Sequence, residues 1–212
     1  MGTVRRPRGR PVLRSDEETR HVLGTAAAAE FTRHGYANTS VAAVAKAAGV
    51  STRTLYRLVP TKAELFELSM GDRIDAFLLA VDERTLEALD TDAALEHILI
   101  AFGALLMDPG CIAISRVLYA EAERFPEIAT RFSTVVVSRV DAAIARWLRD
   151  QESAGRIRLP EGGGSASGFL RGMMIGDVHR AVLLRQAEPP DAATIAARAR
   201  TCARLFLDGC RA

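Results

Sequence analysis

The stretch that decides the fold runs from residue 39 to residue 66 and reads TSVAAVAKAAGVSTRTLYRLVPTKAELF. Its first half holds an apolar stripe with helical spacing, at Val41, Val44, Ala45 and Ala48. Gly49 breaks this helix, and Ser51 or Thr52 opens a second helix that ends before Pro60. Each helix is too short to be stable alone. Joined by a Gly-Val-Ser turn, the pair has the spacing of a helix-turn-helix.

The second of these helices has an inner and an outer face. Leu55, Leu58 and Val59 supply the inner face. The outer face carries two guanidinium groups, two hydroxyls and one phenol, from Thr52, Arg53, Thr54, Tyr56 and Arg57. Arginine reads the O6 and N7 atoms of guanine in the major groove, and hydroxyls donate to phosphates. This composition predicts DNA binding, with simple solvation of the same side chains as the alternative.

Two capping boxes flank the pair, at Ser15 with Glu18 and at Thr61 with Glu64. The first predicts a helix from residue 15 to about residue 34, which Gly35 ends. The second predicts that another helix begins at residue 62. Residues 15–62 are therefore expected to form a three-helix DNA-binding domain.

Residues 22–66 resemble the DNA-binding domain of the tetracycline-repressor (TetR) family. The resemblance rests on Gly35-Tyr36, Thr39-Ser40-Val41, Ala48-Gly49-Val50-Ser51, Thr54-Leu55-Tyr56, and Lys62 with Leu65-Phe66. It implies phosphate contacts from Thr39, Tyr56 and Lys62, and it implies groove-facing positions at Thr52, Arg53, Thr54 and Arg57. We add Ser51 to the predicted DNA-contact residues. Two positions depart from the family pattern, Leu58 where His or Tyr is frequent and Val59 where Phe is common, and both favour repacking against the core.

Charge divides the chain into a basic front and an acidic back. Residues 1–62 hold 11 basic and 4 acidic side chains, a net charge of +7, and residues 63–212 hold 17 and 22, a net charge of −5. A basic front favours nucleic acid over a membrane surface, because the arm formed by residues 1–14 lacks an apolar face. In this arm, Arg8-Gly9-Arg10-Pro11 resembles an AT-hook, which predicts that Arg8 and Arg10 enter the minor groove. A generally basic tail is the alternative.

Residues 63–212 form the second predicted unit, a helical body. Periodicity predicts helices over about 62–89, 92–107, 111–124, 126–154, 165–187 and 191–209. The segment 112–184 loosely resembles the C-terminal domain of AefR-type repressors. This resemblance implies that the body binds a small-molecule effector and forms a homodimer, and the expected fold class of the whole chain is all-α.

Three glycines lie four residues apart in the penultimate helix, at Gly168, Gly172 and Gly176. Glycine costs about 1 kcal/mol per helical position relative to alanine, so three on one face predict close approach of another helix. The last helix offers an alanine row in register, at Ala192, Ala196, Ala199 and Ala203. We expect these two helices to build a four-helix dimer interface, with packing inside one chain as the alternative. Two-fold symmetry also suits a DNA site with two half-sites.

A ligand pocket in the body is expected to be mostly apolar with a few polar groups. The residues that could line it are Phe102, Leu106, Leu118, Trp147, Phe169, Met173 and Met174. Asp177 and His179 lie in a largely apolar helix and could orient a ligand. For each of these residues the alternative is an ordinary place in the core or a structural contact.

Other function classes find little support in the sequence. The histidines show no metal-ligand spacing, and the glycines at 162–164 lack the Lys-Ser/Thr of a phosphate loop, so we expect neither an enzyme nor a bound cofactor or metal. The sequence shows no membrane span and no secretory signal, which predicts a cytoplasmic protein. Three cysteines, an odd number, are expected to be reduced. The remaining alternative is an architectural DNA-binding protein without an effector, against which the large body argues.

Overall fold

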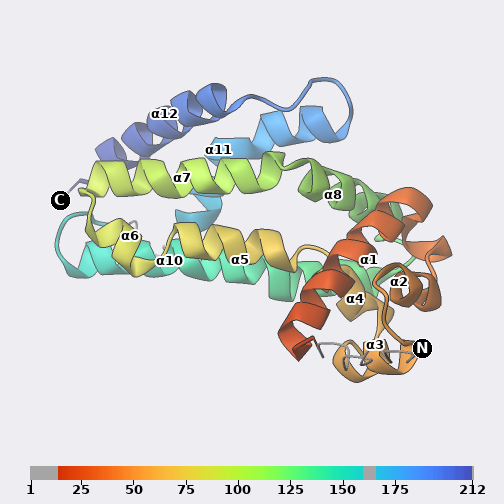
Figure 1. Cartoon of the computed structure of the whole chain (residues 1–212). Helices are drawn as coiled ribbons and strands as arrows, with labels where there is room; N and C mark the ends of the chain where they lie inside the picture. The colour runs from red at the N-terminus through yellow and green to blue at the C-terminus, as the bar shows by residue number, and fades with distance from the viewer. Residues whose placement is uncertain (1–13, 160–165, 212) are drawn as a thin grey trace, which may run out of the picture.

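A computed structural model describes residues 14–159 and 166–211 (Figure 1). Within these ranges the chain is helical, and its only strand-like pairing is an isolated bridge between Ile157 and Arg211. The helices are α1 Asp16–Asn38, α2 Val41–Ala47, α3 Thr52–Leu58, α4 Lys62–Leu68, α5 Gly71–Ala80, α6 Glu83–Glu87, α7 Thr91–Met107, α8 Pro109–Glu121, α9 Pro126–Arg131, the π-helical turn η1 Phe132–Val137, α10 Ser138–Ser153, α11 Ala166–Leu183 and α12 Ala192–Cys210. The all-α prediction is confirmed. The predicted minor-groove residues Arg8 and Arg10 lie outside the described residues.

The helices are arranged in two groups that share one hydrophobic core. Figure 1 shows α1 to α4 gathered at one end, while α5, α7, α10, α11 and α12 extend toward the other end, where α6 lies. Buried apolar side chains form a continuous cluster through both groups, from Leu23 in α1 to Leu207 in α12. The N-terminal group is joined to the rest chiefly where α1 packs on α8 and α4 packs on α9. α4 is therefore in direct contact with the body.

The helix pair that decides the fold forms as the sequence predicts. Ser40 and Ser51 cap α2 and α3, each accepting a hydrogen bond from the backbone N–H three residues later. Gly49 has φ of 67°, the left-handed conformation that the turn between the helices requires. Before this pair, Ser15 and Glu18 make the predicted capping box at the start of α1. Gly35 has φ of 74° and interrupts the helical backbone near the end of α1.

Gly24 marks the place where α1 crosses the chain that follows the helix-turn-helix. A Cβ atom at this buried position would lie 2.7 Å from the backbone oxygen of Leu68 at the end of α4. Backbone cannot rotate away as a side chain does, so we expect Gly24→Ala to lower the free energy of unfolding by about 1–3 kcal/mol.

Urea denaturation of the whole protein measures this effect, and Gly71→Ala is the matched control. A Cβ at Gly71 would meet only the Leu68 Cδ1 atom, at 3.8 Å, which is an ordinary contact. The control should be as stable as the parent or slightly more stable, because alanine favours helix. Equal midpoints for the two variants would contradict the close approach of α1 and α4.

The structure corrects two expectations for the body. The helix predicted over about 62–89 is three helices, because the chain breaks at Ser69, whose hydroxyl donates to the Phe66 carbonyl, and at Asp82, which caps α6. The break between the helices predicted over about 92–107 and 111–124 is shorter than expected, since Asp108 caps α8 and Pro109 occupies its first turn.

A long rod connects the two ends of the molecule. α9, η1 and α10 follow one another without interruption from Pro126 to Ser153, and Gly155, with φ of 69°, follows their end. This confirms the helix predicted over about 126–154. The π-helical turn within it was not predicted, and such turns are frequent at functional sites.

Two alanines of the α12 row face inward while Ala192 is exposed, which corrects part of the predicted dimer interface. Ala199 is fully buried and Ala203 is 4% exposed, on the face of α12 that packs against α7. Small side chains here allow the two helices to pack closely, and neither residue leaves surface for a partner. Ala196, beside them, is half-buried.

Candidate nucleic-acid interface and ligand cavity

The outer face of α3 brings most of the predicted DNA-contact residues together. Leu55 and Leu58 anchor the helix in the core, at 1% and 5% exposure. On the opposite side Tyr56 is 51% exposed. The predicted residues that are exposed on this part of the structure are Ser51, Thr52, Arg53, Tyr56 and Arg57. Thr54 is half-buried and its hydroxyl lies 2.9 Å from the Ser51 hydroxyl, at the N-terminus of the helix.

Arg57 is held by an acidic residue from α1. Its guanidinium donates two hydrogen bonds to the Asp16 carboxylate, at 2.8 and 2.6 Å. The hydrogen bond from Arg57 is the main cause that lowers the pKa of Asp16, and the same contact raises the pKa of Arg57. The only arginine of α3 not engaged in this way is Arg53.

Two predicted phosphate contacts lie away from this face. Thr39 is 3% exposed, and its hydroxyl is within hydrogen-bond distance of the carbonyls of Glu30 and Gly35, so it braces the end of α1. The Lys62 ammonium donates to the Ala37 carbonyl at 3.2 Å and lies 4.7 Å from the centre of the Tyr36 ring. Burial lowers the pKa of Lys62, against the opposing effect of nearby carboxylates. In this structure neither side chain points to solvent.

Tyr36 and Ala37, the partners of Lys62, also join the helix-turn-helix to the body. The sequence analysis does not predict this junction. The Tyr36 hydroxyl donates to Glu127 of α9 at 3.3 Å, and burial together with that carboxylate raises the pKa of Tyr36 to about 12. The Ala37 N–H donates to Glu121 of α8 at 3.2 Å. Arg131 of α9 reaches back to α4, 2.8 Å from Glu67. The run AEAERFPEI at 120–128 was the available signal, since it supplies the Glu121 and Glu127 contacts with Ala37 and Tyr36.

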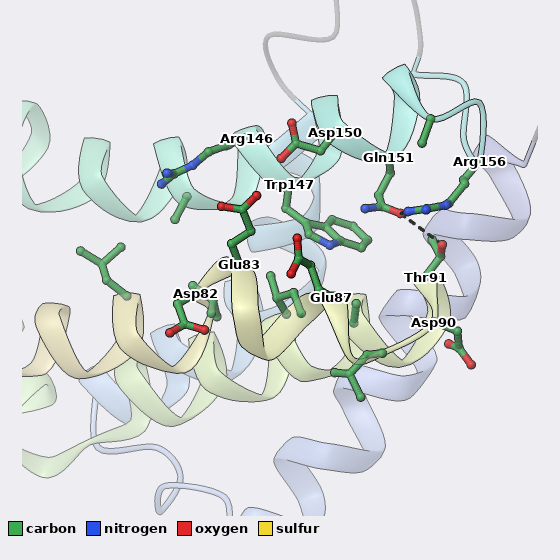
Figure 2. Close-up of a pocket in the computed structure, with 17 residues that line it drawn as sticks. Asp82, Glu83, Glu87, Asp90, Thr91, Arg146, Trp147, Asp150, Gln151 and Arg156 are labelled. Carbon is green, nitrogen blue, oxygen red and sulfur yellow. Dashed lines mark hydrogen bonds between the residues drawn. The ribbon is translucent and has the colours of Figure 1, made fainter.

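The body contains a cavity of about 1060 Å³ between α6 and α10 (Figure 2). Of the residues predicted to bind a ligand, only Trp147 lines it. Phe102 and Leu118 are buried in the core, Leu106 and Met173 are half-buried elsewhere, and Met174 lines a separate cavity of about 130 Å³. Phe169 is 62% exposed, and Asp177 pairs with Arg198 at 2.6 Å. The predicted set is therefore not one pocket, because apolar helical residues fill core positions all around the body.

No group of three His, Cys, Asp or Glu side chains in the described residues could hold a metal ion. The cysteines Cys111, Cys202 and Cys210 are free and buried, and burial raises the pKa of each thiol. No single described helix is long and apolar enough to cross a membrane; α7 and α8 reach that length only as a pair bent by 63°.

Comparison with known proteins identifies both halves of the chain. Residues 24–68 match the bacterial regulatory proteins of the tetR family. Residues 93–210 match the C-terminal domain of AefR-like transcriptional repressors. The chain belongs to the TetR family. Members of this family are DNA-binding repressors regulated by small-molecule ligands, and the chain is a transcriptional regulator of this kind. Both resemblances seen in the sequence are confirmed.

Solved structures share the fold along nearly the whole chain, among them one of a TetR-family regulator. A regulator from Mesorhizobium loti superposes with a TM-score of 0.78 at 22% identity, covering 94% of this chain and 100% of that one. The flavonoid-responsive regulator FrrA gives a TM-score of 0.71 at 22% identity, covering 92% and 98%. GusR from Salmonella enterica gives 0.66 at 21% identity, also covering 92% and 98%. No curated protein matches the sequence.

In this TetR-family chain, α11 and α12 leave an open face. A Cβ atom added at Gly172 or Gly176 would meet nothing within 4 Å, so these glycines do not serve close packing inside the protomer. Gly168, in the first turn of α11, is half-buried. Large apolar side chains are exposed on the same two helices and the loop between them, namely Phe169 at 62%, Leu184 at 60% and Leu205 at 59%.

Proposed function

We propose that this regulator is a homodimeric repressor that binds a palindromic operator through α3 and leaves it when a small molecule binds the body. The observation that carries the proposal is the outer face of α3, where Arg53 and Tyr56 stand exposed on a helix whose inner face is anchored in the core. A rigid helix carrying an arginine and hydroxyl groups suits major-groove readout.

The homodimer is proposed to form through the open face of α11 and α12. Exposed leucine and phenylalanine side chains on neighbouring helices are typical of a protein–protein interface rather than of a solvated surface. The glycines Gly172 and Gly176 would let a partner helix approach closely. A two-fold interface then places two α3 helices for successive major grooves.

Effector response is proposed to act through the junction between the body and the helix-turn-helix. Arg131 and Glu127 lie on α9, which continues into α10 beside the cavity, and they contact α4 and Tyr36. A ligand that shifts this rod changes the position of α4, and with it the spacing of the two α3 helices. By reciprocity, operator DNA lowers effector affinity by the same factor.

Selection of bound duplexes from a random DNA library tests this function. Enrichment of an inverted repeat by the protein at moderate salt, and not by an Arg53→Ala/Tyr56→Ala variant, is the expected result. Equal, unpatterned and salt-sensitive binding by both proteins would instead favour the architectural alternative, in which the basic arm supplies the affinity.

Releasing Arg57 from Asp16 is expected to tighten operator binding. The Asp16→Ala variant frees the Arg57 guanidinium for DNA, and we expect the operator dissociation constant to fall about threefold to tenfold, as for one modest charge-assisted contact added in each half-site. Glu17→Ala removes the same charge from the first turn of α1, where Glu17 forms no ion pair in the described structure. Fluorescence anisotropy with both variants separates release of Arg57 from a general charge effect, and identical gains would contradict the prediction.

A further inference from the structure

Lys62 occupies the first position of α4, directly after the exposed residues Pro60 and Thr61. A lysine that follows a DNA-reading helix is well placed to meet a phosphate, and such contacts supply a large share of DNA affinity. In this structure, however, the ammonium turns inward. It donates to the Ala37 carbonyl at 3.2 Å and lies over the Tyr36 ring, 4.7 Å from the ring centre.

Two glutamates of the body bind the same two partners of Lys62. Glu121 of α8 accepts the Ala37 N–H at 3.2 Å, and Glu127 of α9 accepts the Tyr36 hydroxyl at 3.3 Å. Ala37 is therefore bound on both sides, at its N–H by Glu121 and at its carbonyl by Lys62. We call the group of Lys62, Tyr36, Glu121 and Glu127 the latch, because it joins the helix-turn-helix to two helices of the body.

The charges of the two glutamates offset part of the cost of taking the Lys62 ammonium out of water. Burial is the main cause that lowers the pKa of Lys62, and the charges of Glu121 and Glu127 oppose this shift. None of the ion pairs in the described parts of the chain includes Glu121 or Glu127, so neither charge is neutralised in that way. Without these charges, Lys62 would be a half-buried cation that is stabilised less well than in water.

We propose that Glu121 and Glu127 keep Lys62 away from DNA. While both carboxylates are in place, the ammonium stays over the Tyr36 ring. When their attraction is weakened, the ammonium turns to solvent beside α3 and binds a phosphate of the operator. The body thereby lowers operator affinity through two charges of its own. The inference concerns the regulation of the proposed DNA-binding site, and it rests on the proposed function.

The latch connects the position of the body helices to DNA affinity. Lys62 and Tyr36 belong to the N-terminal group of helices, whereas Glu121 is the last residue of α8 and Glu127 lies in the first turn of α9. A ligand that changes the position of α8 or α9 relative to α1 therefore alters the contacts that keep Lys62 inward. Ligand binding that tightens the latch lowers DNA affinity, and ligand binding that loosens it raises DNA affinity.

The chain has only two lysines, Lys46 and Lys62, so nuclear magnetic resonance can observe Lys62 directly. Lys46 is exposed on α2 and serves as the internal reference. In the full-length protein with isotopically labelled lysine, the Tyr36 ring is expected to shift the Lys62 Cε signal upfield of the Lys46 signal. In Glu121→Gln/Glu127→Gln this shift should largely disappear, because the ammonium leaves the ring.

These glutamine substitutions remove charge and keep the hydrogen bonds of the latch. An amide oxygen accepts from the Ala37 N–H and from the Tyr36 hydroxyl as a carboxylate does. Glu17→Gln/Glu123→Gln is the matched control, since it removes the same charge from two exposed positions that make none of these contacts. The control should keep the Lys62 signal of the parent. A Lys62 signal that is the same in both variants would overturn the proposal.

Operator binding shows what the released lysine does. Relative to the control, Glu121→Gln/Glu127→Gln should bind the operator about threefold to tenfold more tightly, as for one modest phosphate contact added in each half-site. The logarithm of its affinity should also fall more steeply with the logarithm of salt concentration, by about 0.9 for each added phosphate contact. Adding Lys62→Met to this variant should abolish both effects. An equal gain in the control, or a gain that survives Lys62→Met, would overturn the proposal.

The two measurements separate this inference from the proposed function. The lysine spectrum requires no DNA, so an unchanged Lys62 signal overturns the latch even if the protein selects an inverted repeat. Selection of an inverted repeat without any gain when Lys62 is released would also overturn the latch, and it would leave the repressor intact. Failure to select any repeat would instead contradict the proposed function, and with it the latch as its regulation.

Discussion

Replacing Arg53 and Tyr56 by alanine is expected to weaken operator binding by about 10³-fold. Arg53 is the arginine of α3 that no acid holds, and Tyr56 is 51% exposed beside it. A base or phosphate contact of this kind contributes about 1–3 kcal/mol, so a loss of about 2 kcal/mol per half-site becomes about 4 kcal/mol for the dimer. Fluorescence anisotropy with the selected operator, at fixed salt, measures the loss.

The control for this variant is Arg33→Ala, which removes another exposed arginine, on α1 and outside the α3 face. It should bind the operator within about twofold of the parent. Because both substituted side chains of α3 point to solvent, the melting temperature should hardly change. An operator affinity that falls equally in the control would place the effect in overall charge and contradict sequence reading by α3.

The helix-turn-helix was predictable because its signals are local. The caps at Ser15, Ser40 and Ser51 act within one turn of helix, and Gly49 is needed for one backbone angle. Each is encoded by residues next to one another in the chain. The apolar stripe that buries Val44 and Ala45 is likewise a property of a single helix. Such features need no knowledge of what the element packs against.

The partner that each predicted DNA-contact residue has in the structure could not be predicted in the same way. Arg57 meets Asp16, and Lys62 meets Tyr36 and the Ala37 carbonyl, through contacts that link residues 25 or more positions apart. A motif assigns residues to a face, whereas the partner that holds each side chain depends on how α1, α3 and α4 are placed. The junction through Glu121 and Glu127 was missed for the same reason.

The limit of sequence-based prediction is clearest in the body, because small and apolar residues suit several environments. The alanines of α12 have the spacing of a helix contact, and they do make one, but with α7 inside the protomer. The apolar residues expected around a ligand fill the core instead. The cavity is lined by acids of α6 and α10 whose grouping depends on tertiary structure. Of the residues predicted to bind a ligand, Trp147 alone lines this cavity.

Charge placed on the open face of α11 and α12 should dissociate the proposed dimer. Leu184 and Leu205 are 60% and 59% exposed, and two-fold symmetry presents each of them twice. Truncating a central apolar contact typically costs 2 kcal/mol or more, and an unpaired carboxylate in the interface adds to this. For Leu184→Glu/Leu205→Glu we expect the dimer dissociation constant to rise by at least about 10³-fold, measured by sedimentation velocity.

Leu79→Glu is the matched control, because Leu79 is an even more exposed leucine, at 71%, and lies on α5. This control should remain a dimer and keep its operator affinity. The double variant should bind a single half-site and lose at least about 100-fold in affinity for the inverted repeat, because each monomer then binds alone. Folding of the double variant is checked by its helical circular dichroism. A double variant that stays dimeric, or a control that dissociates, would show that the two-fold axis does not lie at α11 and α12. The spacing of the two α3 helices would then be set by another face of the body.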